Sequence, residues 1–436
     1  MIDSTHDPAR RSWVASANDG HSDFPVQNLP HGVFRRRGSR EAWRGGVAIG
    51  DQVLDLAAAC RAGVFDAEVL PLATLAAAAS LNDYMALGRP SWRRLRQALS
   101  ALLSEDAPQR ARLEPCLLPQ AEVEHALPAR IGDYTDFFTS RDHMLNMGRM
   151  FQPDRPELPN FFWLPIAYHG RASTVEVSGA SFPRPWGQRR PPDAAEPVFG
   201  PSAALDYELE LCAWVGPGNR RGEPVPIDQA EDHLFGIGLL NDWSARDLQG
   251  WEAQPLGPFL AKNFLSTVSP WIVTLDALTP FRAPVRRDAG DPPWLPYLRS
   301  ADGNAQGALD LQLSVQLQTA RSEGRSLPVS RTYSRLGHWG FAQMLAHHTS
   351  NGCALAPGDL LGSGTQSGPG PREQGCLMEL TRAGREPLAL DNGETRRMLE
   401  DGDTVILRGR AERPGAVGIG FGECRGTVLP ATAWPA

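Results

Sequence analysis

The chain has 436 residues, more than one compact hydrophobic core usually accommodates, so we expect two domains. Hydrophobic residues make up 42% and charged residues 21%, the balance of an ordinary soluble globular protein. The formal net charge is −7 and no long basic run is present, which argues against a nucleic-acid partner. No apolar stretch approaches the roughly 20 residues of a membrane span, so no membrane partner is expected either.

Glycine, proline and cysteine usage narrows the class further. The 43 glycines and 38 prolines indicate many short strands and loops more than long helices. The six cysteines are scattered without a Cys-x-x-Cys pair, and we interpret them as reduced, mostly buried thiols. Residues 1–21 are polar, lack the apolar core of a signal peptide and are predicted to be a disordered leader. Together these features predict a cytoplasmic protein.

Residues 22–128 are expected to form a small, β-rich N-terminal domain. Short strands are predicted at 32–34, 46–50 and 53–56. Helical stretches follow at 73–86, which is rich in alanine, and at 91–103, where Trp92, Leu95 and Leu99 recur at helical spacing. This region contains no cluster of catalytic residue types, so we expect the chemistry to lie in residues 129–436.

The segment 205–211 is the centre of that second region. Its apolar and acidic residues alternate with the period of a β-strand, which places Asp206, Glu208 and Glu210 on one face. Three carboxylates on one face repel each other unless a cation lies between them, and their oxygens suit hard ions such as Mg²⁺ or Ca²⁺. An exposed strand with a solvated acidic face is the alternative interpretation.

Two further acids stand at the ends of predicted elements. Asp136 precedes a predicted helix that Ser140 caps, and His143 falls in the first turn of that helix. The apolar strand predicted at 235–240 leads directly to Asp242, a position typical of a functional site. One divalent cation could therefore be coordinated by four carboxylates: Asp136, Glu208, Glu210 and Asp242.

Other side chains could supply acid, base and donor chemistry beside such a cation. A helix predicted to begin near Ser244 places Arg246 and Gln249 on one face. Lys262 lies in a largely uncharged stretch and is either partly buried or an ordinary surface lysine. Glu379 lies in the apolar segment 377–380, predicted as a strand, where a buried acid needs a partner. Spacing alone does not show that these residues converge.

Several motifs, long and in the same order, resemble the fumarylacetoacetase family between residues 23 and 429. They are DYTDF at 133–137 with His143, YHGRAS at 168–173, DxExE at 206–210, NDWSARD at 241–247, PLGPFLxK at 255–262, GSGT at 362–365 and LMEL at 377–380. The resemblance implies a mixed, mainly β protein. It would have a small SH3-like barrel domain at 22–128 and a larger catalytic domain with a β-roll fold at 129–436, usually as a homodimer.

The resemblance also implies roles for individual residues. Asp136, Glu208, Glu210 and Asp242 would bind the catalytic Ca²⁺ or Mg²⁺, and a second cation would involve Asp242, Lys262 and Ser266, where the family has threonine at the last position. The implied reaction is metal-dependent hydrolysis of a carbon–carbon bond in a β-diketo acid, such as 4-fumarylacetoacetate to fumarate and acetoacetate. His143, oriented by Glu379, would take a proton from water. The oxyanion would be stabilised by Arg246, Gln249 and Lys262.

The resemblance also implies substrate contacts, and several of these positions differ from the family. They fall on Phe138, Gln152, Tyr168, Gln249, Ala253 and Thr365. Three of these depart from the family, because Phe138 and Ala253 replace tyrosines and Gln152 replaces an arginine, so two hydroxyl donors and one cation are lost. A different β-diketone or acylpyruvate, larger or less acidic, is therefore one alternative. A decarboxylase or isomerase on the same scaffold, and a non-catalytic binding protein, are others.

Overall fold

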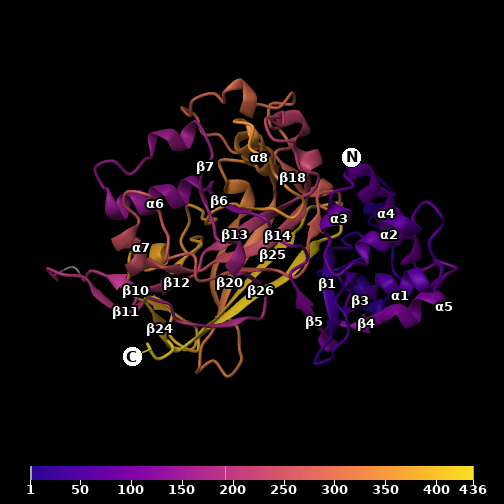
Figure 1. Cartoon of the computed structure of the whole chain (residues 1–436), viewed down its shortest axis with the longest axis horizontal. Helices are drawn as coiled ribbons and strands as arrows, with labels where there is room; N and C mark the ends of the chain where they lie inside the picture. The colour runs from indigo at the N-terminus through magenta and orange to yellow at the C-terminus, as the bar shows by residue number, and fades with distance from the viewer. Residues whose placement is uncertain (1, 192, 436) are drawn as a thin grey trace.

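The computed structural model describes residues 2–191 and 193–435. The first part of the chain, indigo to purple in Figure 1, is built on a five-stranded antiparallel sheet in the order β4-β3-β2-β1-β5. Its strands are β1 (His31–Arg36), β2 (Arg44–Ile49), β3 (Gln52–Asp55), β4 (Leu117–Pro119) and β5 (Val123–Ala126). Its helices are α1 (Leu56–Arg61), α2 (Leu70–Ala76), α3 (Asn82–Met85), α4 (Arg89–Leu102) and α5 (Arg110–Leu113).

The strands and the second helix predicted for residues 22–128 are confirmed, whereas the first helix is not continuous. Strand β1 spans the first predicted segment, β2 and β3 each end one residue before the second and third, and α4 buries Trp92, Leu95 and Leu99 as their spacing predicts. The alanine-rich stretch 73–86 is not one helix, because α2 ends at Ala76 and α3 begins only at Asn82. Between them the backbone N–H of Leu81 donates to the carbonyl of residue 128 instead of continuing a helical ladder.

The prediction of a disordered leader at 1–21 is wrong for residues 2–21, and residue 1 lies outside the described residues. This segment forms two short 3₁₀ helices, η1 (Ser4–His6) and η2 (Ala15–Asn18). The imidazole of His6 makes a 2.7 Å hydrogen bond to the carbonyl of Asp276, and the hydroxyl of Ser12 donates to the carbonyl of Leu103. Polar side chains therefore hold a segment whose composition lacks the apolar periodicity used to predict order.

The second part of the chain contains a large sheet in the order β7-β6-β22-β13-β14-β16-β8, with β17 pairing β14 beside this path. Most neighbours are antiparallel, but β22 runs parallel to β6 and β16 parallel to β8. Its strands are β6 (Tyr134–Phe138), β7 (Ile166–His169), β8 (Val175–Val177), β13 (Leu209–Val215), β14 (Leu234–Asp242), β16 (Ser266–Val268), β17 (Val273–Thr274) and β22 (Leu360–Gly362).

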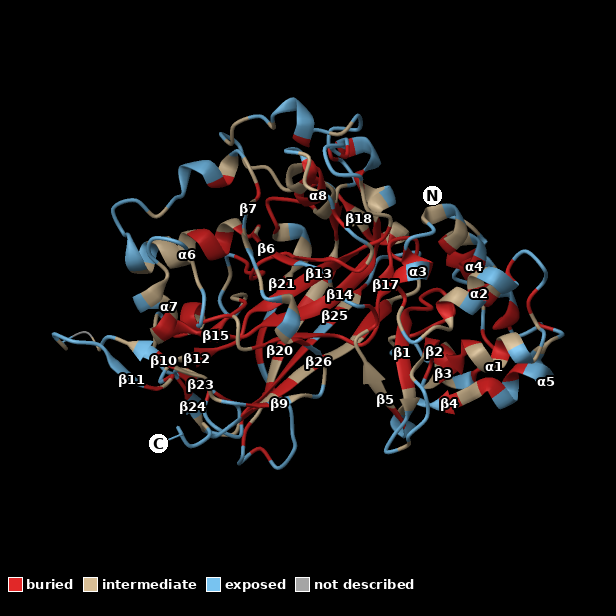
Figure 2. Cartoon of the chain, in the orientation of Figure 1, coloured by how far each residue is buried: buried red, intermediate tan, exposed pale blue. Residues whose placement is uncertain are grey.

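A second, five-stranded sheet packs on the large one, in the order β21-β20-β25-β26-β9. Its strands are β9 (Ser181–Pro183), β20 (Leu311–Gln318), β21 (Leu327–Tyr333), β25 (Thr404–Ala411) and β26 (Ile419–Leu429). The core between the sheets joins Leu209 and Leu211 of β13 to Leu313 and Val315 of β20. Strands β13 and β14 are buried along their whole length, as their red colour in Figure 2 shows, so they form a rigid support at the centre.

Shorter elements complete the architecture. The remaining strands are β10 (Trp186–Arg189), β11 (Val198–Pro201), β12 (Leu205–Asp206), β15 (Ser244–Ala245), β18 (Arg282–Ala283), β19 (Ala308–Leu309), β23 (Leu388–Ala389) and β24 (Thr395–Arg396). The helices are α6 (Arg141–Phe151), α7 (Arg246–Glu252), α8 (Phe341–Thr349) and α9 (Leu377–Leu380). Further 3₁₀ helices are η3 (Glu114–Cys116), η4 (Gln120–Glu122), η5 (Pro159–Phe162), η6 (Ala172–Thr174), η7 (Ile227–His233), η8 (Thr279–Phe281), η9 (Pro296–Leu298) and η10 (Ser334–Leu336).

The two parts share a buried contact. The ring of Phe235 in β14 packs against Trp92 of α4 and Tyr84 of α3, and His31 of β1 forms a bridge with Ile272. The chain is thus a mixed, mainly β protein in which a small N-terminal sheet abuts a larger two-sheet body. Within the described residues, no helix has the length and apolar character needed to cross a membrane.

Candidate active site

Four buried carboxylates meet at the large sheet, on β6, on β14 and at the start of β13, which belong to the run β6-β22-β13-β14. One oxygen from each of the four lies within 4.8 Å of the others: Asp136, Glu208, Glu210 and Asp242. None is more than 5% exposed. We call this set the acidic group. The glycine at 362 makes it possible, because a Cβ there would stand 2.7 Å from the carboxylate of Asp136.

Asp206 does not belong to the acidic group. The single strand predicted at 205–211 is interrupted, since β12 ends at Asp206 and β13 begins at Leu209. The carboxylate of Asp206 accepts hydrogen bonds from the backbone N–H groups of Leu377 and Met378, at 2.8 and 3.0 Å, and from Nε of Arg246 at 2.9 Å. Asp206 therefore anchors the start of α9, which is a structural task.

Two cations lie against the acidic group. Nζ of Lys262 donates to Glu208 at 2.5 Å and to Asp242 at 2.6 Å, so this lysine is buried and not a surface residue. Nη1 of Arg246 lies 2.8 Å from Glu208 and also donates to the side-chain oxygen of Gln249 at 3.1 Å. The helix predicted after residue 244 thus places Arg246 and Gln249 together, as expected.

Two hydroxyl groups also converge on Asp242. The phenol of Tyr168 donates to Oδ2 of Asp242 and the hydroxyl of Ser266 donates to Oδ1, each at 2.9 Å. Tyr168 lies on β7 and Ser266 on β16, which pairs with β14, so the large sheet itself supplies both hydroxyl groups. Every residue predicted from the resemblance to hold a cation therefore lies in or directly beside the acidic group.

Burial and mutual repulsion raise the pKa values of some of these acids, while nearby cations lower that of Glu208. Burial, reinforced by the negative charge of Asp242, raises the pKa of Asp136 well above its usual range. Burial and the neighbouring acids do the same to the pKa of Glu210. Although burial also opposes ionisation of Glu208, Lys262 and other nearby cations hold its pKa below the usual range. The acidic group thus has one stabilised anion and two carboxylates without enough compensating positive charge.

The donor set fits a hard divalent cation. Oδ1 of Asp136 and Oε1 of Glu210 are buried and accept no hydrogen bond from any described residue. Unpaired buried carboxylate oxygens are costly unless a cation or a proton satisfies them. An all-oxygen set suits ions of the Mg²⁺ and Ca²⁺ type and disfavours metals that prefer sulfur or nitrogen. The geometry therefore supports a cation at this position without identifying the ion.

A histidine–carboxylate pair stands beside the acidic group. Ser140 caps α6 through a 3.2 Å hydrogen bond from the N–H of His143, as predicted. Nδ1 of His143 lies 2.7 Å from Oε2 of Glu379, and both side chains are buried. The pair lies near the acidic group, because the N–H groups of Leu377 and Met378, just before Glu379, bond to Asp206, two positions before Glu208. The prediction that Glu379 lies in a strand is wrong, because residues 377–380 form helix α9.

Three side chains that the sequence analysis did not identify complete the surroundings of Glu379. Asn146 donates to Oε1 at 2.9 Å, Ser367 donates to Oε2 at 2.8 Å, and the thiol of Cys376 lies 3.2 Å from Oε2. Burial opposes ionisation of Glu379, but the adjacent His143 and the hydrogen bonds from Asn146 and Ser367 hold its pKa below the usual range. The position of Asn146, three residues after His143 on α6, is the one signal that could have revealed it.

The remaining expected substrate contacts are dispersed. The ring of Phe138 packs edge-on against His143, with centroids 5.3 Å apart, and Thr365 is buried beyond the glycine-rich turn. Gln152 is exposed at the C-terminal cap of α6, and Ala253 is half-buried at the cap of α7. Among the described residues, the side chain of Gln152 has no hydrogen-bond partner. Phe138 therefore contacts the proposed base directly, whereas Gln152 and Ala253 are placed only at the ends of two helices.

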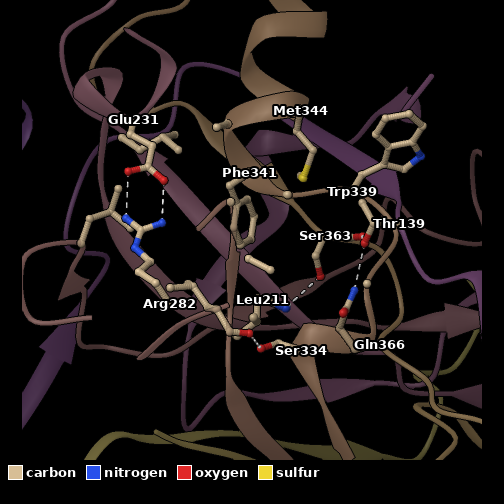
Figure 3. Close-up of a pocket in the computed structure, with 18 residues that line it drawn as sticks. Thr139, Leu211, Glu231, Arg282, Ser334, Trp339, Phe341, Met344, Ser363 and Gln366 are labelled. Atoms are coloured by element: carbon tan, nitrogen blue, oxygen red, sulfur yellow. Dashed lines mark hydrogen bonds and ion pairs between the residues drawn. The ribbon is translucent and has the colours of Figure 1, made fainter. Parts of the chain in front are cut away.

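The cavity in Figure 3 lies apart from this chemistry. Figure 3 shows Leu211 and Ser363 on its wall and the Glu231–Arg282 ion pair at its edge. Because Leu211 follows Glu210 on β13, its side chain points to the opposite face of the strand. The cavity holds about 40 Å³, room for a few water molecules and not for a substrate.

Fold and site together define a mixed, mainly β protein with a buried acidic site suited to metal-dependent chemistry. Residues 27–128 match the family model described as Fumarylacetoacetase N-terminal, and residues 134–429 match the one described as Fumarylacetoacetate (FAA) hydrolase C-terminal. The chain therefore belongs to the fumarylacetoacetase family.

Individual relatives cover nearly the whole chain. A fumarylacetoacetase of Arabidopsis thaliana is 47% identical over 425 residues, which is 96% of this chain and 98% of its own. The fumarylacetoacetase of Homo sapiens is 46% identical over 428 residues, with 96% and 99% covered. A solved fumarylacetoacetate hydrolase from Exiguobacterium antarcticum has a TM-score of 0.50 at 17% identity, covering 92% of this chain and 99% of that one, and it shows the fold alone.

Proposed function

We propose that this chain is a metal-dependent hydrolase that cleaves a carbon–carbon bond of 4-fumarylacetoacetate to give fumarate and acetoacetate. The observation that carries the proposal is the pairing of His143 with Glu379 beside four convergent carboxylates. Relatives named fumarylacetoacetase, 46–47% identical over nearly the full length, support the same reaction. Fumarylacetoacetate is a β-diketo acid, whose paired oxygens suit a site built around a hard cation.

The cation itself has a defined task in this proposal. The acidic group would hold Mg²⁺ or Ca²⁺, and Asp242, Lys262 and Ser266 would contribute to a second cation position. When bound, the cation supplies Lewis-acid polarisation of the β-diketone. Asp136 and Glu210 contribute the two unpaired oxygens that such an ion would satisfy.

His143 and Glu379 would activate the attacking water molecule. Nδ1–H of His143 donates to Glu379, which leaves Nε2 free to take a proton from a water molecule. The anionic carboxylate of Glu379 fixes this tautomer and stabilises the imidazolium as it forms. Glu379 can serve in this way because Asn146 and Ser367 hold it ionised and in place.

The developing negative charge on the attacked carbonyl needs donors. Nη2 of Arg246 is buried and makes no hydrogen bond to a described residue, so one guanidinium N–H group remains available for an oxyanion. Gln249 lies against the same guanidinium, and the ammonium of Lys262 lies on the other side of Glu208. These three side chains are therefore the proposed oxyanion stabilisers.

Phe138 favours a second candidate substrate. An aromatic ring without a hydroxyl packs against the proposed base, and Gln152 and Ala253 bring neither cation nor hydroxyl. A larger or less acidic β-diketone or acylpyruvate would bind beside these three side chains better than a dicarboxylate that needs an ionic contact. The reaction class is unchanged in this alternative, with Tyr168, Gln249 and Thr365 as the other proposed contacts.

The proposal also covers the domain architecture, the oligomeric state and the location of the protein. The sheet β4-β3-β2-β1-β5 is the proposed SH3-like barrel and the two packed sheets the β-roll, with the boundary near residue 128. A homodimer and a cytoplasmic location are proposed from the family resemblance and the composition.

A panel of β-diketo acids with varied distal groups, assayed with added Mg²⁺ or Ca²⁺, tests the function. We expect turnover of fumarylacetoacetate or a close analogue, and its collapse in His143→Ala. Turnover that survives in His143→Ala would indicate a decarboxylase or isomerase instead. A folded protein inactive on the whole panel would overturn the proposed hydrolase.

A further inference from the structure

A third donor stands beside the proposed catalytic pair. Sγ of Cys376, a carboxylate oxygen of Glu379 and a ring nitrogen of His143 all lie within 4.8 Å of one another. Sγ lies 3.2 Å from Oε2 of Glu379, which in turn lies 2.7 Å from Nδ1 of His143. All three side chains are buried, and Cys376 forms no disulfide.

This cluster differs in kind from the acidic group. A thiol, an imidazole and a carboxylate form a ligand set that zinc binds in many proteins, whereas Mg²⁺ and Ca²⁺ prefer oxygen alone. Loss of one thiol proton would balance the charges, because a thiolate and a carboxylate together neutralise one Zn²⁺ and leave the loaded cluster without net charge. The ligands are also supported from outside, since Asn146 and Ser367 orient the carboxylate of Glu379.

We propose that His143, Cys376 and Glu379 form an inhibitory site for a thiophilic divalent cation such as Zn²⁺, with a water molecule as the fourth ligand. Binding forms bonds from the metal to Nδ1, to Sγ and to a Glu379 oxygen. It breaks the Nδ1–H···Oε2 hydrogen bond and releases the thiol proton to solvent. The proton of Nδ1 moves to Nε2 of the same ring, so the oxidation states of metal and sulfur do not change.

Cation binding would inhibit the enzyme by changing which ring nitrogen of His143 carries the proton. With its proton on Nε2, His143 can no longer accept one from water, and Glu379 no longer pairs with the ring. The bound cation therefore blocks proton transfer without occupying the acidic group. Loss of rate should appear in kcat more than in KM, because substrate contacts are unaffected. This inhibition rests on the proposed hydrolase function, but binding at the cluster does not.

Co²⁺ provides a test of binding that needs no activity. Full-length protein saturated with Mg²⁺ is titrated with Co²⁺, and the near-ultraviolet absorption of a thiolate–cobalt bond is recorded. We expect one such band per chain in the natural sequence and in Cys60→Ser, which alters a half-buried cysteine of α1. The band should be absent in Cys376→Ser, or in Cys376→Ala if the serine variant does not fold.

Zn²⁺ is then added to the Mg²⁺-loaded enzyme during turnover. Zn²⁺ should lower kcat reversibly, and Cys376→Ser should need at least about tenfold more Zn²⁺ for half-inhibition, relative to its own zinc-free rate, because one ligand is lost. The absence of a cobalt band in the natural sequence, or a band that persists in Cys376→Ser, would overturn the proposal. A band that depends on Cys376 in a protein with no hydrolase activity would support the site and refute the proposed function.

Discussion

The charge of Glu379 offers the sharpest test of the proposed base. Glu379→Gln keeps the size and shape of the side chain but removes the negative charge 2.7 Å from Nδ1 of His143. In the natural sequence the carboxylate accepts hydrogen bonds from four side chains: His143, Asn146, Ser367 and Cys376. An amide has only one acceptor oxygen and cannot accept all four. If the amide oxygen serves His143 and Ser367, the amide NH₂ must face the NH₂ of Asn146.

The size of the effect follows from the lost charge pair. An imidazolium and a carboxylate whose charge centres lie about 4 Å apart attract by about 4 kcal/mol at an effective dielectric constant of about 20. If this attraction develops fully in the transition state, its loss slows the reaction by about 10³-fold, at about 1.4 kcal/mol per factor of ten. KM should change little, because Glu379 does not contact substrate in the proposed site.

Steady-state kinetics on the best substrate of the panel measures this effect. Asn146→Ala is the matched control, since it removes one donor but keeps the charge, and it should lower kcat by no more than about tenfold. Near-ultraviolet circular dichroism verifies that both variants are folded. A kcat of Glu379→Gln within tenfold of the natural enzyme, or an equally damaging Asn146→Ala, would refute the reasoning.

The other predictions concern the acidic group, its hydroxyl donor and the buried histidines. In calorimetric titration, Glu210→Gln should weaken Mg²⁺ or Ca²⁺ binding by at least about 100-fold, because it removes one of four anionic ligands. Asp206→Asn should leave binding within a few-fold but destabilise the fold by about 3 kcal/mol, because the buried guanidinium of Arg246 loses one of its two anionic partners. Equal effects of the two variants on binding would contradict the assignment. Tyr168→Phe should weaken binding only about fivefold, for one lost hydrogen bond, and a 100-fold loss would show that the phenol does more. Burial lowers the pKa of His125 and of His338 to about 4, so the folded protein excludes protons that the unfolded chain takes up below about pH 6.5. The free energy of unfolding, measured in urea, should therefore fall as the pH drops from about 6.5 to about 4. His338→Asn should lower the slope of this free energy against pH by the contribution of one bound proton. An unchanged slope would be inconsistent with a neutral buried imidazole.

The strands could be predicted because their signals are local, whereas the convergence of the acidic group was implied by the family resemblance. The fully apolar run before Asp242 becomes β14, and the capping hydroxyl of Ser140 places His143 where the sequence indicated. Carboxylates in otherwise apolar segments indicated that Glu208, Glu210 and Asp242 need a partner, and the structure brings them together with Asp136.

What could not be predicted depends on long-range contacts. Asp206 belongs to the same alternating acidic pattern as Glu208 and Glu210. Its carboxylate nevertheless accepts a hydrogen bond from the N–H group of Leu377 in α9, 171 positions away. Residues 377–380 are apolar and too short for periodicity to separate strand from helix, so the helical setting of Glu379 was missed. The segment 2–21 is held by hydrogen bonds from polar side chains such as His6, and composition alone reads such residues as disorder.

Crystals soaked in Mn²⁺, a hard cation that carboxylates accept and that scatters anomalously, test the central claim most directly. The account predicts an anomalous peak bonded to Asp136, Glu208, Glu210 and Asp242, next to His143. A diffraction map without a peak among these four side chains, or with manganese bound only elsewhere, would contradict it.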